Sequence, residues 1–508
     1  ELRARLYNRT PLTHTFLWWA NAAAMVHDAY QSFFPPDVHY VADHALRAQV
    51  SFPAALDSYY GIPYHQRPGA NRLDWYRNIP VPTSYMVCQT NFGFFGGYDH
   101  RAGGGFVHVA DPHLSPGKKQ WTWGNHEFGR AWDRELTDHN GPYIELMAGV
   151  FTDNQPDFSY LLPFETKAFS QFWWPLQYIG PVQQANQHAA LRLLVRDDRV
   201  IEIGLCVPEQ FTGELLLKRG ASILLAANLD LKPGEAWQDT SLTFEGESPA
   251  ELLATLTSSS GDPVLTYRPP DLSTPPRHRP QATEPPPPQD IPSNDELYLT
   301  GEHLEQYRHP TREPEPYWNE ALARDPGDAR CNIATGRRLL ARGLFHKAAT
   351  RFQSAIDRLT HRHPNPVTGE AHYHLGLALF FQWQRRPAVG RSCGGPPQSS
   401  LFSSSYSSLS KAAWSCEWRS PAHYLLACLD CQQADFPAAL AHLDASLATN
   451  RDHNKAKVLS AVIHRHRRHA EQARLVLTDM IALDRLEEAT NAIQFPRTTS
   501  YAHFGVKK

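Results

Sequence analysis

The feature that most constrains this chain is a proline-rich run at residues 269–292, in which ten of the twenty-four residues are proline. Proline lacks a backbone N–H and fixes its φ angle, so such a run extends neither a helix nor the interior of a sheet. Few apolar side chains accompany the prolines, and we expect an extended, semi-rigid spacer that does not pack. The chain of 508 residues is therefore expected to fold as two halves that contain several domains.

The half before the spacer has the pattern of β-structure. In residues 1–180, short alternating apolar runs are broken by glycine, proline, asparagine and aspartate. In residues 181–268, seven shorter runs separated by polar turns predict a small β-sandwich. Because residue 1 is not methionine and falls inside a strand pattern, we expect the chain to be a fragment that lacks its upstream part.

The half after the spacer and a connector, together 269–312, has a helical period over 313–495. One unit begins with Gly336, and residues of small, large and small size follow after 12, 16 and 19 positions: Ala348, Phe352 and Ala355. These are the packing offsets of a tetratricopeptide repeat. Ala427 and Ala461 stand 34 residues apart, which is the length of that repeat. We therefore predict a tetratricopeptide α-solenoid.

A serine-rich stretch interrupts the repeat pattern at about 387–410. Gly376 opens a further unit, but eight of the twelve residues in 399–410 are serine. Serine is a modest helix former, and we expect no repeat helix there. A flexible insertion and a stretch read out of frame both explain the pattern, and both predict disorder.

Charge and cysteine content narrow the class of protein. The formal net charge is −3, so we expect no nucleic-acid partner and no membrane attachment. Seven scattered cysteines do not make a disulfide framework and favour the cytoplasm. Cys428 and Cys431 form a lone C-x-x-C within a helical pattern, which favours buried thiols over a metal site. We expect neither a metal nor a cofactor.

Residues suited to carbohydrate binding gather in 121–133, which holds three tryptophans, an amide and two acids. Sugars present apolar C–H faces ringed by hydroxyls, so their sites combine aromatic platforms with carboxylates and amides. We infer a carbohydrate site from this cluster. The alternative is that the tryptophans fill a β core and the acids lie in solvated turns, and it stays open for each single residue.

Several long segments resemble the bacterial tetratricopeptide-repeat proteins that carry the domain of unknown function 5107. They are LYNRTP at 6–11, FLWWAN at 16–21, IPVPTSY at 79–85, TDNQPDF at 152–158 and, after the spacer, NDELYLTG at 294–301. The resemblance covers nearly the whole chain. It implies this order of domains but no established activity.

That domain is similar, more distantly, to the galactose-mutarotase (aldose epimerase) supersandwich. There a glutamate on a late strand precedes an aromatic-Pro-Asp turn and a last strand, and here Glu145 precedes 151–157 and the segment 161–176. The resemblance implies that 1–180 is the C-terminal part of such a supersandwich and that Glu145 takes a proton from a sugar. The histidine motif of those enzymes has no counterpart here, because WWAN at 18–21 stands in its place.

Candidate site residues follow from the cluster and the resemblance together. Glycoside hydrolysis requires a second carboxylate near the first. The catalytic candidates are Glu145, Glu127 and Asp133. The substrate-binding candidates are Trp18, Trp19, Asn21, Trp121, Trp123, Asn125, Asp153, Asn154 and Gln155.

Two functions remain open on the sequence. The first is a protein that binds or processes carbohydrate, as a glycoside hydrolase or sugar-epimerase-like enzyme, and that binds a protein partner through its repeats. The second is a non-catalytic scaffold or adaptor that acts through the tetratricopeptide repeats.

Overall fold

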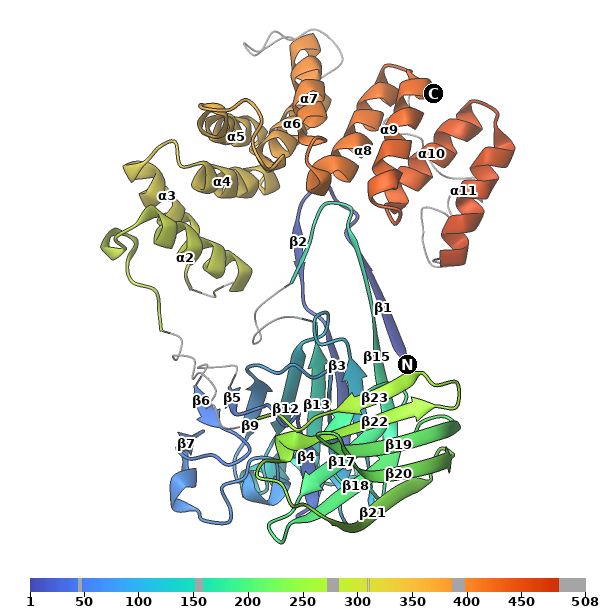
Figure 1. Cartoon of the computed structure of the whole chain (residues 1–508). Helices are drawn as coiled ribbons and strands as arrows, with labels where there is room; N and C mark the ends of the chain where they lie inside the picture. Colours follow the sequence, from blue (N-terminus) through green and yellow to red (C-terminus); the bar gives the residue numbers. More distant parts are fainter. Residues whose placement is uncertain are drawn as a thin grey trace. The chain divides into compact units, whose positions relative to one another are not determined.

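The computed structural model describes residues 1–43, 48–150, 159–271, 283–307, 309, 311–385 and 398–483. The chain divides into two compact units. The first comprises Glu1–Ala4, Leu17–Ser159 and Ala168–Glu284, and the second Arg5–Phe16, Tyr160–Lys167 and Pro285–Lys508. Sheets make up the first unit and helices most of the second, so the predicted change from β- to α-structure is confirmed (Figure 1).

Two sheets share a core in the first part of unit one. Their strand orders are β1–β15–β11–β10–β4 and β3–β13–β12–β9–β5–β6. Phe95 from the first sheet packs in one cluster with Ile144 and Leu146 from the second, and all three are fully buried. The strands are β1 Leu2–Tyr7, β3 Trp19–Met25, β4 Tyr30–Phe33, β5 Tyr40–Ala42, β6 Gln49–Ser51, β9 Thr83–Val87, β10 Phe94–Asp99, β11 Gly104–Ala110, β12 Gly117–Thr122, β13 Tyr143–Gly149 and β15 Thr166–Gln177.

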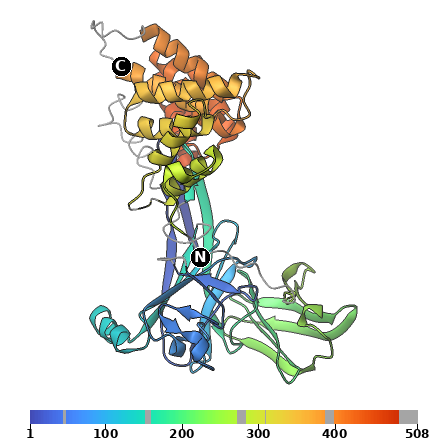
Figure 2. The same ribbon diagram turned by 90° about the vertical axis from the view of Figure 1, so that its left-hand side faces the viewer.

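The predicted small β-sandwich follows in the same unit. Two four-stranded sheets, β16–β17–β18–β21 and β20–β19–β22–β23, enclose a core of leucine, isoleucine and valine. Helix α1 (Glu127–Leu136) projects from the first pair of sheets on the side away from this sandwich (Figure 2). The sandwich strands are β16 Gln184–Ala185, β17 Ala190–Val195, β18 Val200–Cys206, β19 Phe211–Arg219, β20 Ser222–Leu231, β21 Ala236–Thr243, β22 Leu252–Ser258 and β23 Pro263–Tyr267.

The helices of unit two pack in chain order as a repeat array (Figure 1). The predicted packing residues Ala348, Phe352 and Ala355 are fully buried, as are Ala427 and Ala461. A Cβ on Gly336 would come within 2.5 Å of the Phe352 ring, so glycine permits the close approach of helices α4 and α5. The helices are α2 Asn294–Tyr307, α3 Glu315–Arg324, α4 Ala329–Ala341, α5 Phe345–Thr360, α6 Glu370–Gln384, α7 Gln398–Ala412, α8 Cys416–Gln432, α9 Phe436–Thr449, α10 Asn454–His466 and α11 Ala470–Leu483.

The expectation of disorder in 399–410 is wrong, because this stretch forms helix α7 and packs on α6. The buried residues of α7 recur at intervals of four, four and three: Leu401, Ser405, Leu409 and Ala412. The Ser405 hydroxyl donates a hydrogen bond to the Gly376 carbonyl at 2.8 Å. Burial of this stripe outweighs the modest helix propensity of serine. Residues 386–397, which include the start of the expected interruption, lie outside the described residues.

The expectation that the whole proline-rich run remains unpacked is wrong for 285–292. Ile291 is fully buried in the cluster formed by α2, α3 and α4. The carbonyls of this segment accept hydrogen bonds from helix α3 and from the loop before it: Arg312 to Pro285 at 3.3 Å, Tyr317 to Pro286 at 3.1 Å and Arg324 to Ile291 at 2.7 Å. Proline lacks a donor but keeps its acceptor, so arginine and tyrosine donors can dock the run. Residues 272–282 lie outside the described part of the chain.

The second unit also contains two segments from the N-terminal half, Arg5–Phe16 and Tyr160–Lys167, which we call the arm. Within it β2 (His14–Phe16) pairs with β14 (Ser159–Leu161). Phe164 is 1% exposed, and its ring centroid lies 4.8 Å from that of Tyr424 and 4.5 Å from that of His453. Polar contacts join the arm to the array: Arg5 with Asp452 (2.9 Å), the Tyr373 hydroxyl with the Pro11 carbonyl (3.0 Å), the Asn450 amide with the Phe164 carbonyl (3.0 Å) and the Lys455 N–H with the Tyr7 hydroxyl (3.0 Å).

We expect Leu409→Ala to lower the free energy of unfolding of the repeat array by about 2–5 kcal/mol, because it leaves a cavity between α6 and α7. The matched exposed substitution Ser404→Ala should change it by less than about 0.5 kcal/mol. Denaturant unfolding followed by far-UV circular dichroism measures both. Hydrogen exchange should show protected amides in α7, and fast exchange throughout 399–410 would contradict the helix.

A buried lysine gives the first unit a pH-dependent stability. Lys118 on β12 is 1% exposed, and burial lowers its pKa to about 8 from the ordinary 10.5, opposed by Asp37. Between these two pH values the unfolded chain binds more protons than the folded one. The free energy of unfolding should therefore rise with pH in this window.

We expect Lys118→Met to remove this rise and to stabilise the protein at pH 7 by up to about 3 kcal/mol. Denaturant unfolding at pH 7.5 and 9.5, compared with the wild type, measures the difference. An unchanged pH dependence in the variant would show that Lys118 is not its source.

Candidate functional site

The candidate residues on β3, β12 and β13 share one face of the six-stranded sheet. Glu145 pairs with Trp121 on β12 and with Ala23 on β3. Directly paired residues of antiparallel strands point to the same face, whereas Ile144 and Leu146 alternate to the other face and fill the core. Ala23 is exposed, so the face that carries Glu145 is open to solvent at β3, whereas Lys119 on the same face of β12 is buried.

An aromatic cluster stands beside Glu145. The ring centroids of Trp121 and Trp123 lie 4.5 Å apart with the rings edge to face, and Trp123 stacks on Trp132 of helix α1 at 4.8 Å. The Trp123 Nε1–H donates to the Tyr143 hydroxyl at 3.3 Å. Trp132 is 41% exposed, so helix α1 both buttresses Trp123 and adds an accessible indole.

Glu145 has a basic neighbour in Lys119, which lies on the same face two residues before Trp121. Burial raises the pKa of Glu145, and the Lys119 charge opposes that shift. Burial likewise lowers the pKa of Lys119, and Glu145 opposes it. The Lys119 ammonium also lies 5.4 Å from the ring of Trp19, within cation–π range. Asn21 extends this row and is exposed.

The other two catalytic candidates lie on α1. Glu127, with an 81% exposed side chain, forms a 3.4 Å ion pair with Arg130. Asp133 is 6% exposed, and neither carboxylate oxygen has a hydrogen-bond partner among the described residues. Burial raises the pKa of Asp133, opposed by Arg134. Within the described part of the chain, no hydrogen bond or ion pair joins either acid to Glu145.

The remaining candidates have different surroundings. The Trp18 ring meets Phe169 edge to face at 5.6 Å. The Asn125 amide donates to the carbonyls of Tyr76 at 3.2 Å and Arg77 at 2.8 Å, so its NH₂ group holds a loop together. The last three candidates lie outside the described residues: Asp153, Asn154 and Gln155.

Two residues of this face are absent from the sequence-based set. Lys119 and Tyr143 each stand two positions from a candidate on the same strand, and period-two alternation would have placed them on its face. We call the set Trp19, Asn21, Lys119, Trp121, Trp123, Tyr143 and Glu145 the indole–carboxylate face. Among the described residues, no group of three histidine, cysteine, aspartate or glutamate side chains could hold a metal ion. None of the described helices has the length and apolar character needed to cross a membrane.

The fold defines a β-rich protein that carries a tetratricopeptide-like helical array. Residues 1–176 match the family model described as "Domain of unknown function (DUF5107)", and residues 184–267 match "YphG-like protein, second domain". These matches end where the first pair of sheets and the small sandwich end, respectively.

Solved structures similar to the chain include tetratricopeptide proteins. A TPR-domain protein from Parabacteroides distasonis ATCC 8503 is 14% identical, with 99% of this chain and 69% of that chain covered and a TM-score of 0.29. YrrB, titled a TPR protein with an unusual peptide-binding site, is 15% identical over 39% of this chain and 90% of its own, with a TM-score of 0.30. PilW, titled a type IV pilus biogenesis factor, is 15% identical over 40% and 83%, with a TM-score of 0.31.

We expect Lys119→Met to raise the pKa of Glu145, because it removes the cation that stabilises the carboxylate. A carboxyl ¹³C titration of glutamate-labelled protein, with Glu145→Gln to assign the signal, measures the midpoint. Lys218→Met in the small sandwich is the matched control and should leave that midpoint unchanged. Equal midpoints in wild type and Lys119→Met would contradict the coupling.

Proposed function

We propose that this chain binds carbohydrate on the indole–carboxylate face and a protein partner on its helical array. The pairing of Trp121 with Glu145 across β12 and β13 is the observation that carries the first part. An indole offers an apolar platform for a sugar C–H face, and a carboxylate beside it accepts hydrogen bonds from hydroxyls at the rim. Asn21 adds an exposed donor in the same row, whereas Lys119 is 3% exposed and acts on Glu145 through its charge.

The open character of this face favours binding of an extended glycan over enclosure of a single sugar. Asn21, Ala23 and Met25 alternate along β3 and are all exposed. A ligand could therefore lie along the strand without displacing protein. Binding sites for chains of sugars need such length, whereas enclosed pockets suit small ligands.

The finer alternative is catalysis by Glu145 in a mutarotase-like or hydrolytic reaction. Burial raises the pKa of this carboxyl, the direction that suits a general base or acid. A hydrolase needs a second carboxyl group near the first, at a separation that sets its stereochemistry. Asp133, buried and without a hydrogen-bond partner among the described residues, is the candidate for that role over the exposed Glu127.

The proposal of a protein partner has its support in the helix pairs of unit two. Such arrays present a continuous surface made by the first helix of each pair. In this chain the arm covers that surface at α6, at α8 and before α10, through Tyr373, Tyr424 and His453. A partner would therefore approach the part of the array that the arm leaves open.

A glycan panel tests the carbohydrate proposal. We expect Trp121→Ala to weaken glycan binding about tenfold or more, because an indole contributes apolar contact area. Trp75→Ala, which removes an indole outside this face, is the matched control and should bind as the wild type does. Binding that survives Trp121→Ala undiminished, or no binding across the panel, would contradict the proposal.

Release of reducing sugar by the same protein separates enzyme from scaffold. If Glu145 is catalytic, Glu145→Gln should lower turnover by a factor of about 100 to 10,000. The exposed Glu214→Gln on β19 is the matched control. Glycan binding without turnover in the wild type would favour the non-catalytic scaffold.

A further inference from the structure

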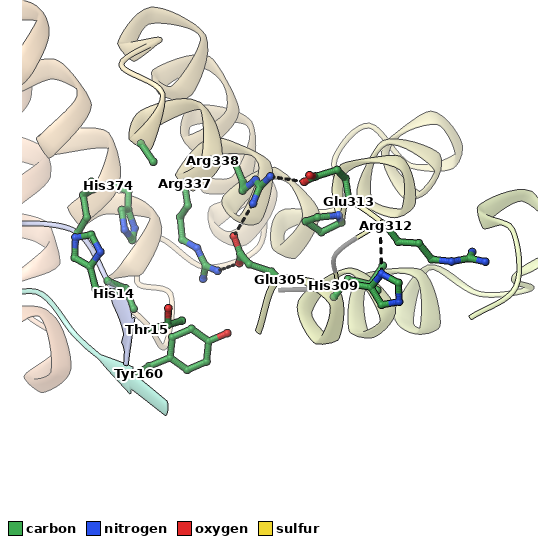
Figure 3. A pocket seen from close by; sticks show the side chains of 15 residues that line it. His14, Thr15, Tyr160, Glu305, His309, Arg312, Glu313, Arg337, Arg338 and His374 are labelled. Carbon is green, nitrogen blue, oxygen red and sulfur yellow. Dashed lines mark hydrogen bonds and ion pairs between the residues drawn. The ribbon is translucent and has the colours of Figure 1, made fainter. Parts of the chain in front are cut away.

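The open end of the repeat array contains a cavity of about 450 Å³ (Figure 3). All of its lining residues belong to the second unit. Helices α2, α4 and α6 form one side, His309 and residues 312–314 another, and the arm closes it with residues 12–15 and Tyr160. The volume suits a small ligand or a long side chain with part of its backbone.

We propose that this cavity binds a lysine or arginine side chain of the protein partner. The inference rests on the proposed protein-binding role of the array and names the chemistry that the partner must bring. Charge, aromatic and apolar groups at the cavity each favour a long cationic side chain.

Carboxylates outnumber guanidinium groups in the ion-pair network at the cavity, although Glu305 and Glu313 are the carboxylates of that network that line it. Glu305 lies between two arginines, 2.8 Å from Arg337 and 3.9 Å from Arg338 (Figure 3). Further carboxylates contact these arginines: Glu302 (3.6 Å) and Glu370 (3.4 Å) at Arg337, and Glu313 (2.8 Å) and Glu315 (2.7 Å) at Arg338. Five carboxylates thus contact three guanidinium groups, because Arg342 also pairs with Glu315.

Arg312, which also lines the cavity, is a fourth guanidinium group, so the carboxylates remain in excess by one charge. Arg312 donates through Nη1 to the Pro285 carbonyl. Burial lowers the pKa of His374 to about 4, so this imidazole is neutral at pH 7. An anionic ligand would have to compete with carboxylates already bound to Arg337 and Arg338. A cation instead joins carboxylates that carry excess charge.

Two tyrosines at the network report the same sign of field. Burial raises the pKa of Tyr160, and Glu305 and Glu302 raise it further, whereas Arg337 opposes them with a smaller effect. The pKa of Tyr298 on α2 is also raised by burial and by Glu302, and Arg337 opposes them with a smaller effect. The negative charges therefore dominate at both hydroxyls.

The lining also fits the apolar stem of a lysine or arginine. Leu12, Leu304 and Ala341 provide aliphatic surface, and the ring of Tyr160 offers a face for a cation. Long cationic side chains bury their methylenes while their charged ends reach polar groups. The cavity places carboxylates and aliphatic surface within one small volume.

Fluorescence anisotropy with two labelled hexapeptides tests the inference on the full chain. One peptide alternates alanine with lysine and the other alternates alanine with glutamate. We expect the lysine peptide to bind, more weakly as salt rises, and Glu305→Gln to weaken its binding about tenfold, the effect of one charge-assisted hydrogen bond. Glu320→Gln, which breaks a surface ion pair with Arg324, is the matched control and should not change binding.

Glu313→Gln keeps the test independent of folding. Glu313 has a 69% exposed side chain, so this variant should fold even if Glu305→Gln does not, and it should weaken the lysine peptide several-fold. Preference for the glutamate peptide, or lysine-peptide binding equal in wild type and Glu313→Gln, would overturn the cation site and leave the protein-binding role of the array standing. Absence of binding by either peptide would overturn the cation site. Glycan binding by the indole–carboxylate face would be unaffected.

Discussion

Burial of Phe164 between Tyr424 and His453 is the contact on which the second unit depends. It inserts a side chain from the N-terminal half into the core of the helical array, where the ring is 1% exposed. His453 stays neutral because burial lowers its pKa to about 3, so the ring contact involves no charge. The chain consequently passes between its two units at five places, and the proline-rich run is one of them.

In the first unit, the candidate site depends on the alternation of side chains between the two faces of the sheet. The sequence identified Glu145, Trp121 and Trp123 because indoles and acids cluster there, and the structure pairs Glu145 with Trp121 across two strands. Register was not predictable, since it depends on which strands become neighbours and on the turn between them. For this reason Lys119 and Tyr143 were not predicted as site residues, although each lies two residues from a candidate on its own strand.

In the helical half, the spacing of apolar residues predicts the helices better than the amino-acid composition does. Spacing predicted the repeats, because Ala348, Phe352 and Ala355 are core positions whatever their neighbours. Composition misled in 399–410, where the count of serines hid an apolar stripe that includes Leu401 and Leu409. A helix in a repeat array is stabilised mainly by burial against its neighbours, so position carries more information than propensity. Docking of 285–292 through its carbonyls was hidden for a related reason, since the donors lie elsewhere in the chain.

The array presents two chemically different surfaces as a result. Where the arm docks, aromatic side chains such as Phe164 and Tyr424 are covered by the chain itself. At the open end, a partly buried guanidinium needs nearby anions, and Glu302, Glu305 and Glu370 raise the pKa of Arg337 against the effect of burial. Removing one member of such a network leaves an uncompensated buried charge, which is strongly destabilising. The members are therefore held together even where the whole network adds little to the free energy of unfolding. A surface built in this way stays compatible with water when unoccupied and discriminates between ligands by charge rather than by apolar area.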